Sequence, residues 1–227
     1  YPLRRQRQMC IRDRKMGIDN LRILVGSDGK RGVKTKVEPT LQEAPGVYND
    51  TILAGLDYLL MEMGKRKMLA VLYLNNSWEW SGGYGYYLEQ AGLGQAPRPN
   101  EDGYPAFMNF VAKYASCEKA HQLFYDYVKF ILTRTNRYTK KKYKDDPAIM
   151  SWQIGNEPRA FSKEQLPAFE KWLGEASKLI RSLDKNHLIS IGSEGKWGCE
   201  GELNCWERIC ADKNVDYCNI HLWPYNW

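Results

Sequence analysis

Short apolar runs alternate along the chain with segments whose apolar residues recur at helical spacing. The apolar runs are residues 21–25, 69–74, 149–154, 188–191 and 217–220, and we predict that each is a strand. Helices are predicted between them at 52–63, 120–131, 166–183 and 203–209, the first capped by Asn49 or Asp50 and the third preceded by a capping-box signature, Ser162 and Gln165. Such alternation favours a parallel sheet, either doubly wound or closed into a barrel.

Polar and aromatic residues follow four of the predicted strands. They are Asn75 and Asn76, Asn156 and Glu157, Glu194 and Trp197, and His221 and Trp223. Barrel enzymes gather such residues after the carboxyl ends of several strands. No GxGxxG or GxxxxGK motif follows a strand, which removes the main support for a doubly wound nucleotide-binding fold. We therefore predict an α/β fold of the (β/α)8 TIM-barrel type, incomplete, with about five of its eight strands present.

The net charge of +6 is concentrated at one end of the chain. Residues 1–15 hold six basic side chains against Asp13 alone, a net of +5, so the remaining residues carry only +1. This opening segment lacks apolar periodicity, and we predict that residues 1–15 are a non-native or disordered basic segment. No nucleic-acid-binding motif accompanies the charge, and no apolar stretch approaches the roughly 18 residues of a membrane span, so we predict neither kind of partner.

The cysteines and histidines do not have the spacing of a metal site. The six cysteines form no CxxC pair and the three histidines are far apart, so we predict no metal site. Cys199, Cys205 and Cys210 can pair in an oxidising compartment, but the sequence cannot choose among the possible connectivities.

The segment from Ser151 to Phe161 places a carboxylate directly after an apolar strand. Pro158 biases Glu157 away from helical backbone geometry, which holds its side chain at the strand end. Beside apolar and aromatic walls, burial would raise the pKa of this carboxyl and allow it to donate a proton to a leaving oxygen. A solvent-exposed glutamate near a helix start is the alternative that the Asn-Glu-Pro tripeptide alone favours.

Together with five other segments, this motif resembles glycoside hydrolase family 5, and within it the endo-β-1,4-mannanases. The matching segments are MGIDNLRIL (16–24), PGVYND (45–50), LYLNNSWEWSGGYGYYLEQAG (72–92), YKDDPAIMSWQIGNEPRA (143–160), DKNHLISIGSEG (184–195) and VDYCNIHLWPYNW (215–227). The resemblance extends over nearly all of 16–227, which it predicts to be part of a catalytic barrel.

The resemblance implies roles for particular residues. Glu157 matches the general acid/base, Asn156 the residue that hydrogen-bonds the sugar 2-hydroxyl, Arg22 the arginine that orients the nucleophile, and His221 the histidine beside the reaction centre. The implied substrate-side residues are Asn76, Trp78, Trp80, Arg159, Glu194, Trp197 and Trp223. Either Trp78 or Trp80 supplies a stacking platform, and the sequence does not choose between them.

The family's nucleophile is a glutamate after the seventh strand, and we expect it to be absent from this chain. The resemblance implies an endo-acting retaining hydrolase that cleaves β-1,4-mannosidic bonds, and we expect this chain alone to be inactive because it lacks the second carboxylate. The implied substrates are β-mannan, glucomannan or galactomannan, and the implied reaction needs no metal and no organic cofactor. We expect the protein to be a monomer that meets these polymers outside the cell or at its surface. Another family 5 β-glycanase, such as a cellulase, and a non-catalytic glycan-binding relative remain alternatives.

Overall fold

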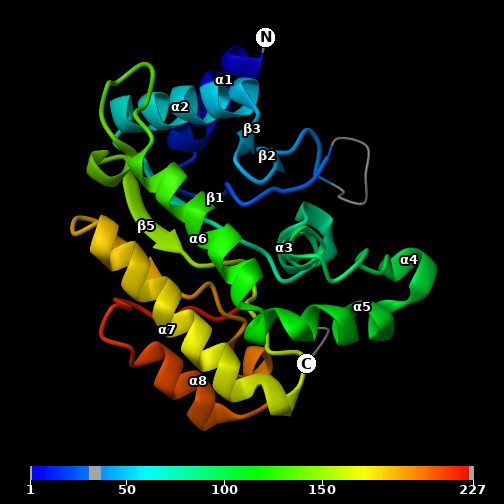
Figure 1. Ribbon diagram of the computed structural model, residues 1–227. Helices are drawn as coiled ribbons and strands as arrows, with labels where there is room; N and C mark the ends of the chain where they lie inside the picture. Colours follow the sequence, from blue (N-terminus) through cyan, green and yellow to red (C-terminus); the bar gives the residue numbers. More distant parts are fainter. Residues whose placement is uncertain (1, 31–36, 225–227) are drawn as a thin grey trace.

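A four-stranded parallel sheet organises the molecule (Figure 1). The computed structural model describes residues 2–30 and 37–224. The sheet has the order β1 (Asn20–Leu24), β4 (Leu69–Tyr73), β5 (Ile149–Gln153) and β6 (Leu188–Ser190). Arg22 pairs with Val71, while Tyr73 pairs with both Leu24 and Gln153. Four of the predicted strands are therefore confirmed, in one sheet whose carboxyl ends lie along one edge.

Helices connect these strands as the apolar periodicity predicts. The predicted helices are α2 (Asp50–Lys65), α6 (Glu118–Thr133), α7 (Leu166–Leu183) and α8 (Leu203–Cys210). The sequence analysis did not identify α3 (Gly83–Ala91), α4 (Pro99–Asp102), α5 (Tyr104–Val111) or the hairpin of β2 (Gln42–Ala44) and β3 (Val47–Tyr48). Short 3-10 turns complete the chain: η1 (Glu79–Ser81), η2 (Ala112–Ser116), η3 (Tyr143–Asp145), η4 (Lys163–Gln165) and η5 (Gly195–Cys199). Figure 1 shows α6 and α7 side by side in front of the sheet.

Helix starts follow the predicted signals only in part. Asn49 caps α2, since its side-chain oxygen accepts from the backbone N–H groups of Thr51 and Ile52 at 3.1 and 3.2 Å. The capping box predicted from Ser162 and Gln165 is wrong. A 3-10 turn lies between Ser162 and α7, and the Ser162 side chain makes no capping hydrogen bond.

The predicted strand at 217–220 is not a strand, so the described sheet has four strands rather than five. The segment nevertheless runs beside β6. Asp216 donates its N–H to Ile189 O at 2.9 Å and accepts the Ile189 N–H on Oδ2 at 2.7 Å. Asn219 accepts the Gly192 N–H at 3.0 Å. Side-chain oxygens thus occupy positions that backbone carbonyls fill in a regular ladder.

The prediction of disorder for residues 1–15 is also wrong, because Pro2–Lys15 forms helix α1, which packs beside α2 (Figure 1). Cys10 on this helix is fully buried. Arg7 forms an ion pair with Glu62 of α2 at 3.8 Å. Basic residues in the last turn favour the helix dipole. Packing of one face of α1 against α2 therefore stabilises this helix, although its sequence shows little apolar periodicity.

An aromatic core lies under the carboxyl edge of the sheet. Tyr84 stacks on Tyr114 with ring centroids 3.9 Å apart, and Trp172 of α7 contacts Tyr114 edge-on at 5.1 Å. The Tyr114 hydroxyl accepts a hydrogen bond from Asn75, just beyond β4, at 3.1 Å. This packing fixes the loop that follows β4. Within the described residues, no helix has the length and apolar character needed to cross a membrane.

Candidate active site

Glu157 lies just beyond β5, in a backbone conformation that the neighbouring strands impose. Its φ of +50° is in the left-handed region, which costs a residue other than glycine on the order of 1–3 kcal/mol. The Glu157 N–H donates to Gly192 O at 2.9 Å, and the Ser77 hydroxyl donates to the Glu157 carbonyl. Loops after three strands therefore hold the residue, and Pro158 excludes the right-handed helical alternative.

The Glu157 carboxylate is bound at both oxygens. Oε1 lies 2.7 Å from Nδ1 of His221, and Oε2 accepts the indole N–H of Trp78 at 2.6 Å. Only 14% of the side chain is exposed. The alternative of a solvent-exposed loop glutamate is therefore wrong, and the predicted proximity of Glu157 and His221 is confirmed.

The pKa of Glu157 differs in direction from the sequence-based expectation. Burial raises the pKa of this carboxyl, but hydrogen bonds from His221 and Trp78, with a smaller effect of Trp223, outweigh burial and hold the pKa below its usual value. The expectation of a raised pKa is wrong because it took account of burial against apolar and aromatic side chains but not of the hydrogen-bond donors that contact the carboxylate. The carboxyl is ionised at neutral pH.

Arg22 connects the three strands beside Glu157. Its Nε donates to Gln153 Oε1 at 2.7 Å, its Nη1 donates to Asn156 Oδ1 at 3.0 Å, and its guanidinium lies 4.1 Å from the centroid of the Tyr73 ring. Gln153 and Tyr73 were missed by the sequence analysis. A signal existed, since both are the last residues of their strands and the register places them on the same face of the sheet as Arg22.

Asn156 and Asn76 pair across the ends of β5 and β4. Asn76 Oδ1 accepts from the Asn156 amide and from the Trp78 N–H, both at 3.2 Å, and its own amide donates to Ser81 at 2.9 Å. Asn76 is fully buried. Asn76 therefore positions the side chain of Asn156 and the backbone of Trp78. Because it is fully buried, it has no exposed surface for the sugar contact that the sequence predicted.

Trp78 is the tryptophan of its loop that contacts Glu157. Phe161 meets it edge-on with centroids 5.5 Å apart, and the Arg159 guanidinium lies 5.6 Å from its ring centroid. Trp80 lies in η1, where its carbonyl accepts from the Val37 N–H. Which of the two tryptophans stacks on a sugar stays a prediction, and Trp78 is the one that contacts Glu157.

A second carboxyl, Glu194, lies near the first. It forms an ion pair with Arg159, with Nε and Oε1 2.8 Å apart. Burial raises the pKa of Glu194 to about 7; Arg159 opposes this shift, and the negative charge of Glu157 adds to it. The raised pKa expected at Glu157 is therefore found at Glu194. Trp197 and Trp223, 40% and 55% exposed, are the open aromatic surfaces of this end of the chain.

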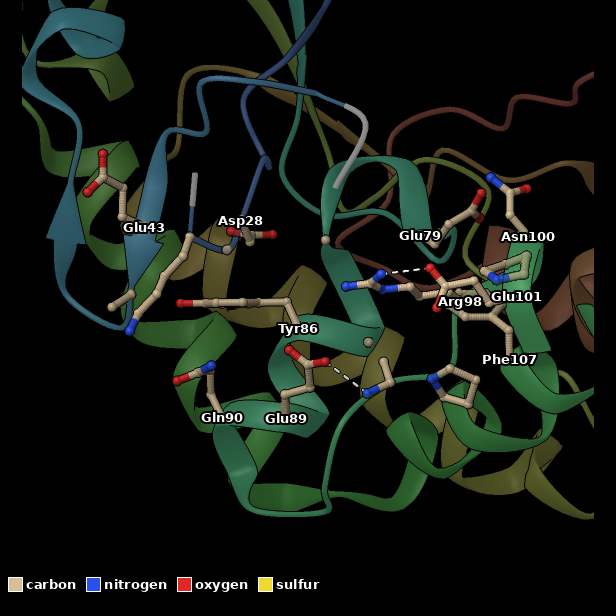
Figure 2. Close-up of a pocket in the computed structure, with 18 residues that line it drawn as sticks. Asp28, Glu43, Glu79, Tyr86, Glu89, Gln90, Arg98, Asn100, Glu101 and Phe107 are labelled. Atoms are coloured by element: carbon tan, nitrogen blue, oxygen red, sulfur yellow. Dashed lines mark hydrogen bonds and ion pairs between the residues drawn. The ribbon is translucent and has the colours of Figure 1, made fainter. Parts of the chain in front are cut away.

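A separate cavity of about 430 Å³ lies beyond η1 and contains none of the predicted site residues (Figure 2). Figure 2 shows Tyr86 among the acidic side chains of Asp28, Glu43 and Glu89. Burial raises the pKa of Asp28 to about 7. Across the described part of the chain, no group of three or more His, Cys, Asp or Glu side chains could hold a metal ion.

Comparison with known proteins identifies the family to which this arrangement belongs. A family model described as "GH family 5 beta-mannosidase-like" matches residues 4–227. The chain belongs to glycoside hydrolase family 5. Mannan endo-1,4-beta-mannosidase 4 of Solanum lycopersicum is 34% identical over 196 residues, which are 82% of this chain and 47% of that protein. A namesake from Oryza sativa subsp. japonica is 32% identical over 202 residues, with 82% and 41% covered.

Solved family 5 structures match the fold over nearly the whole chain. The glycoside hydrolase family 5 mannosidase of Rhizomucor miehei superposes with a TM-score of 0.88 at 35% identity, covering 99% of this chain and 53% of its own. The endo-1,4-beta-D-mannanase of Thermotoga petrophila RKU-1 gives 0.78 at 25%, covering 96% and 63%. The sheet is thus part of a family 5 TIM barrel, and the chain spans about half the length of the relatives it matches.

In this family 5 chain, the structure brings most of the predicted residues together. Glu157, Asn156, Arg22 and His221 form one connected cluster with Trp78. Arg159 and Glu194 lie directly beside it. Contact of Trp80, Trp197 and Trp223 with a sugar remains a prediction.

Proposed function

We propose that Glu157 is the proton-transferring carboxyl of an endo-acting retaining hydrolase that cleaves β-1,4-mannosidic bonds. The observation that carries the proposal is the fixation of both Glu157 oxygens by His221 and Trp78, beside Arg22, at the carboxyl ends of parallel strands. A general acid must be held at one position relative to the leaving oxygen, and this geometry does so. The mannan endo-1,4-beta-mannosidases among its relatives support mannan, glucomannan or galactomannan as substrates.

The lowered pKa of Glu157 suits one half of a retaining reaction directly. An ionised carboxylate can take a proton from the water that hydrolyses a glycosyl-enzyme intermediate. The other half needs the protonated form. A nucleophile carboxylate about 5 to 5.5 Å away would raise the pKa of Glu157 by like-charge repulsion, and a bound sugar would add to the effect of burial.

We propose that the nucleophile lies outside this chain. Among the described residues, Glu194 is the carboxyl whose charge is coupled to Glu157, and its ion pair with Arg159 commits it to another contact. Carboxylate attack on an anomeric carbon requires an ionised group, whereas a pKa of about 7 leaves Glu194 partly protonated at neutral pH. Glu194 and Arg159 instead offer a charged, hydrogen-bonding surface to a sugar next to the scissile bond.

The polymeric substrate also implies a location. Mannans are too large to enter a cell, so we propose that the whole protein acts in the extracellular space or at the cell surface. It needs neither metal nor organic cofactor for this reaction, since the two carboxyl groups supply both proton transfer and nucleophilic attack.

Azide rescue tests the proposal in the complete protein. Glu157→Gln should lower the hydrolysis of mannan by at least about a thousandfold. Azide, which needs no general base, should restore turnover of an aryl mannoside and yield a β-mannosyl azide with retained configuration. The matched control is Glu207→Gln, at an exposed position on α8, which should keep full activity.

Two outcomes would count against this function. Full activity of the Glu157→Gln protein would remove the proton-transfer role. Faster release of sugar from carboxymethylcellulose than from mannan would keep the chemistry but assign another family 5 substrate.

A further inference from the structure

The cavity of about 430 Å³ beyond η1 joins buried groups to exposed ones. Asp28, Tyr86 and Phe107 line it and are 0%, 5% and 1% exposed, whereas Lys30 and Gln90, which also line it, are exposed. Its volume falls within the roughly 300–1,000 Å³ range of small-molecule sites. A small molecule that enters past the exposed side chains can therefore reach the buried ones.

Tyr86 brings an unpaired polar group to this cavity. Among the described residues, its buried hydroxyl has no hydrogen-bond partner. Figure 2 shows its ring between the side chains of Asp28 and Glu89. Burial raises the pKa of Tyr86, so the hydroxyl keeps its proton and can donate it in a hydrogen bond. A buried polar group without a partner costs free energy, and an oxygen of a bound ligand would offset that cost.

The other side chains of the cavity restrict the kind of ligand. Five carboxyl and two cationic side chains line it, and one of the cations, Arg98, pairs with Glu101 at 2.7 Å. This excess of carboxyl groups disfavours a phosphate or a carboxylate ligand. No described group of three or more His, Cys, Asp or Glu side chains could hold a metal ion. A cationic amine would have to lie beside Lys30 and Arg98.

A neutral polyhydroxylated ring fits both kinds of surface in the cavity. Its hydroxyl groups can donate to carboxyl oxygens such as those of Asp28 and accept the Tyr86 proton. Its C–H groups can pack on apolar and aromatic surfaces, which Phe107, Pro97 and Pro99 supply. Sugars combine these two properties in one ring.

We propose that this cavity is a second carbohydrate site, which binds one neutral hexopyranosyl unit. The Tyr86 hydroxyl donates to an oxygen of this sugar, the Asp28 carboxyl accepts from a sugar hydroxyl, and the Phe107 ring packs on the C–H groups. The identity of the sugar, a mannosyl unit of the main chain or a galactosyl branch, rests on the proposed function, whereas the binding of a hexopyranosyl ring does not.

The η1 turn joins this cavity to the candidate active site. Glu79, the first residue of η1, lines the cavity, and Trp78 directly before it donates to Glu157. The Asp28 N–H donates to Ser81 O at 2.8 Å, while the Ser81 hydroxyl oxygen accepts from Asn76 at 2.9 Å. Because Glu157 does not line the cavity, the unit bound there is not the one that is cleaved.

A sugar titration of the purified 227-residue chain tests the site. The methyl groups of Ala44 and Ala96 line the cavity, and the methyl group of Ala160, next to Arg159, reports on the candidate active site. In a chain labelled with 13C-methyl alanine, methyl β-D-mannopyranoside or methyl α-D-galactopyranoside should shift the NMR signals of Ala44 and Ala96 along one saturable curve. Any shift of Ala160 should follow a different curve.

The two sugars and an amine separate the possible ligands. Tighter binding of the galactoside identifies a branch site, and tighter binding of the mannoside identifies a main-chain site. Shifts of Ala44 and Ala96 with spermidine but with neither sugar would overturn the neutral ligand. No shift of these two methyl groups up to the solubility limit of both sugars would overturn the site. Hydrolysis plays no part in this measurement, so either result leaves the role of Glu157 untouched.

Tyr86→Phe tests the contact with the hydroxyl group. The ring stays while the donor is lost, so the affinity for the sugar should fall by roughly three- to tenfold. The Tm of the free chain should stay equal or rise, because the variant removes a buried group without a partner. The matched control, Tyr138→Phe, lies outside the cavity and should keep the wild-type affinity. Unchanged affinity in Tyr86→Phe, or a lower Tm, would overturn the proposed contact.

Discussion

His221 Nδ1 lies 2.7 Å from Glu157 Oε1, although the two residues are 64 positions apart in the sequence. The contact joins the loop after β5 to the segment that runs beside β6. It helps to keep Glu157 ionised, because burial raises the pKa of this carboxyl while its interactions with His221, Trp78 and Trp223 together outweigh burial and lower the pKa.

Removal of this imidazole should raise the pKa of Glu157. In His221→Ala, the carboxylate loses one of its two described short hydrogen bonds while most of its burial remains. The titration of the Glu157 carboxyl carbon, followed by NMR with 13C-labelled glutamate, should move to higher pH. An unchanged or lower titration midpoint would show that His221 does not control this carboxyl. The matched control, His187→Ala, removes a histidine that pairs with Asp184 instead.

This chain alone should hydrolyse mannan extremely slowly. A retaining reaction needs a nucleophile as well as Glu157, and loss of a nucleophile typically lowers the rate by roughly four to six powers of ten. Reducing-sugar release by the purified 227-residue chain should therefore not exceed that of its Glu157→Gln variant. Activity in this chain that Glu157→Gln abolishes would identify a second carboxylate within the chain.

Glu194 should make the fold less stable as the pH rises. Its pKa is raised from 4.5 to about 7 in the folded chain, so the folded state holds its proton more tightly than the unfolded state. The contribution of Glu194 to stability is complete below about pH 4.5 and is lost as the pH rises to about 7. The Tm of Glu194→Gln should not show this loss of stability between about pH 4.5 and about pH 7. A difference in Tm between variant and wild type that is constant from pH 4 to about 8 would contradict the shift.

Gly192 should tolerate no side chain, because the loop after β6 approaches that after β5 too closely. A Cβ there would lie 1.8 Å from Gly155 O, and the residue has a φ of +84°. Gly192→Ala should lower the free energy of unfolding by about 3 kcal/mol or more, measured by urea unfolding. Gly46, with a φ of +75° and no atom within 4 Å of its Cβ position, is the matched control. Gly46→Ala should cost only the left-handed backbone, about 1–2 kcal/mol.

The sequence predicts the elements that one local pattern determines. Helices α2, α6, α7 and α8 follow from apolar spacing, and Asn49 is recognisable as a cap from its residue type and its place ahead of an apolar-periodic segment. The location of Glu157 follows from a carboxylate placed directly after an apolar strand. Each of these predictions depends on residues within about one or two turns of each other.

The errors concern partners that are distant in sequence. The pKa of Glu157 depends on Trp78, 79 positions away, and on His221, 64 positions away, which no local window includes. The prediction of a strand at 217–220 was wrong because the side chains of Asp216 and Asn219 bond Ile189 of β6 and Gly192 just beyond it. Helix α1 was missed because its stability comes from packing on α2 rather than from its own periodicity.

The two edges of the sheet, at β1 and at β6, differ in how far their backbone groups are already hydrogen-bonded. At β6 and just beyond it, the side chains of Asp216 and Asn219 already bond the backbone N–H groups of Ile189 and Gly192. A further strand would have to displace these side chains in order to pair there. At β1, β4 is the neighbour on one side and no strand of the described chain lies on the other. Edge strands of this kind recruit further strands through their main-chain groups. Additional barrel strands, whether from this polypeptide or from a separately made one, should therefore join first at β1.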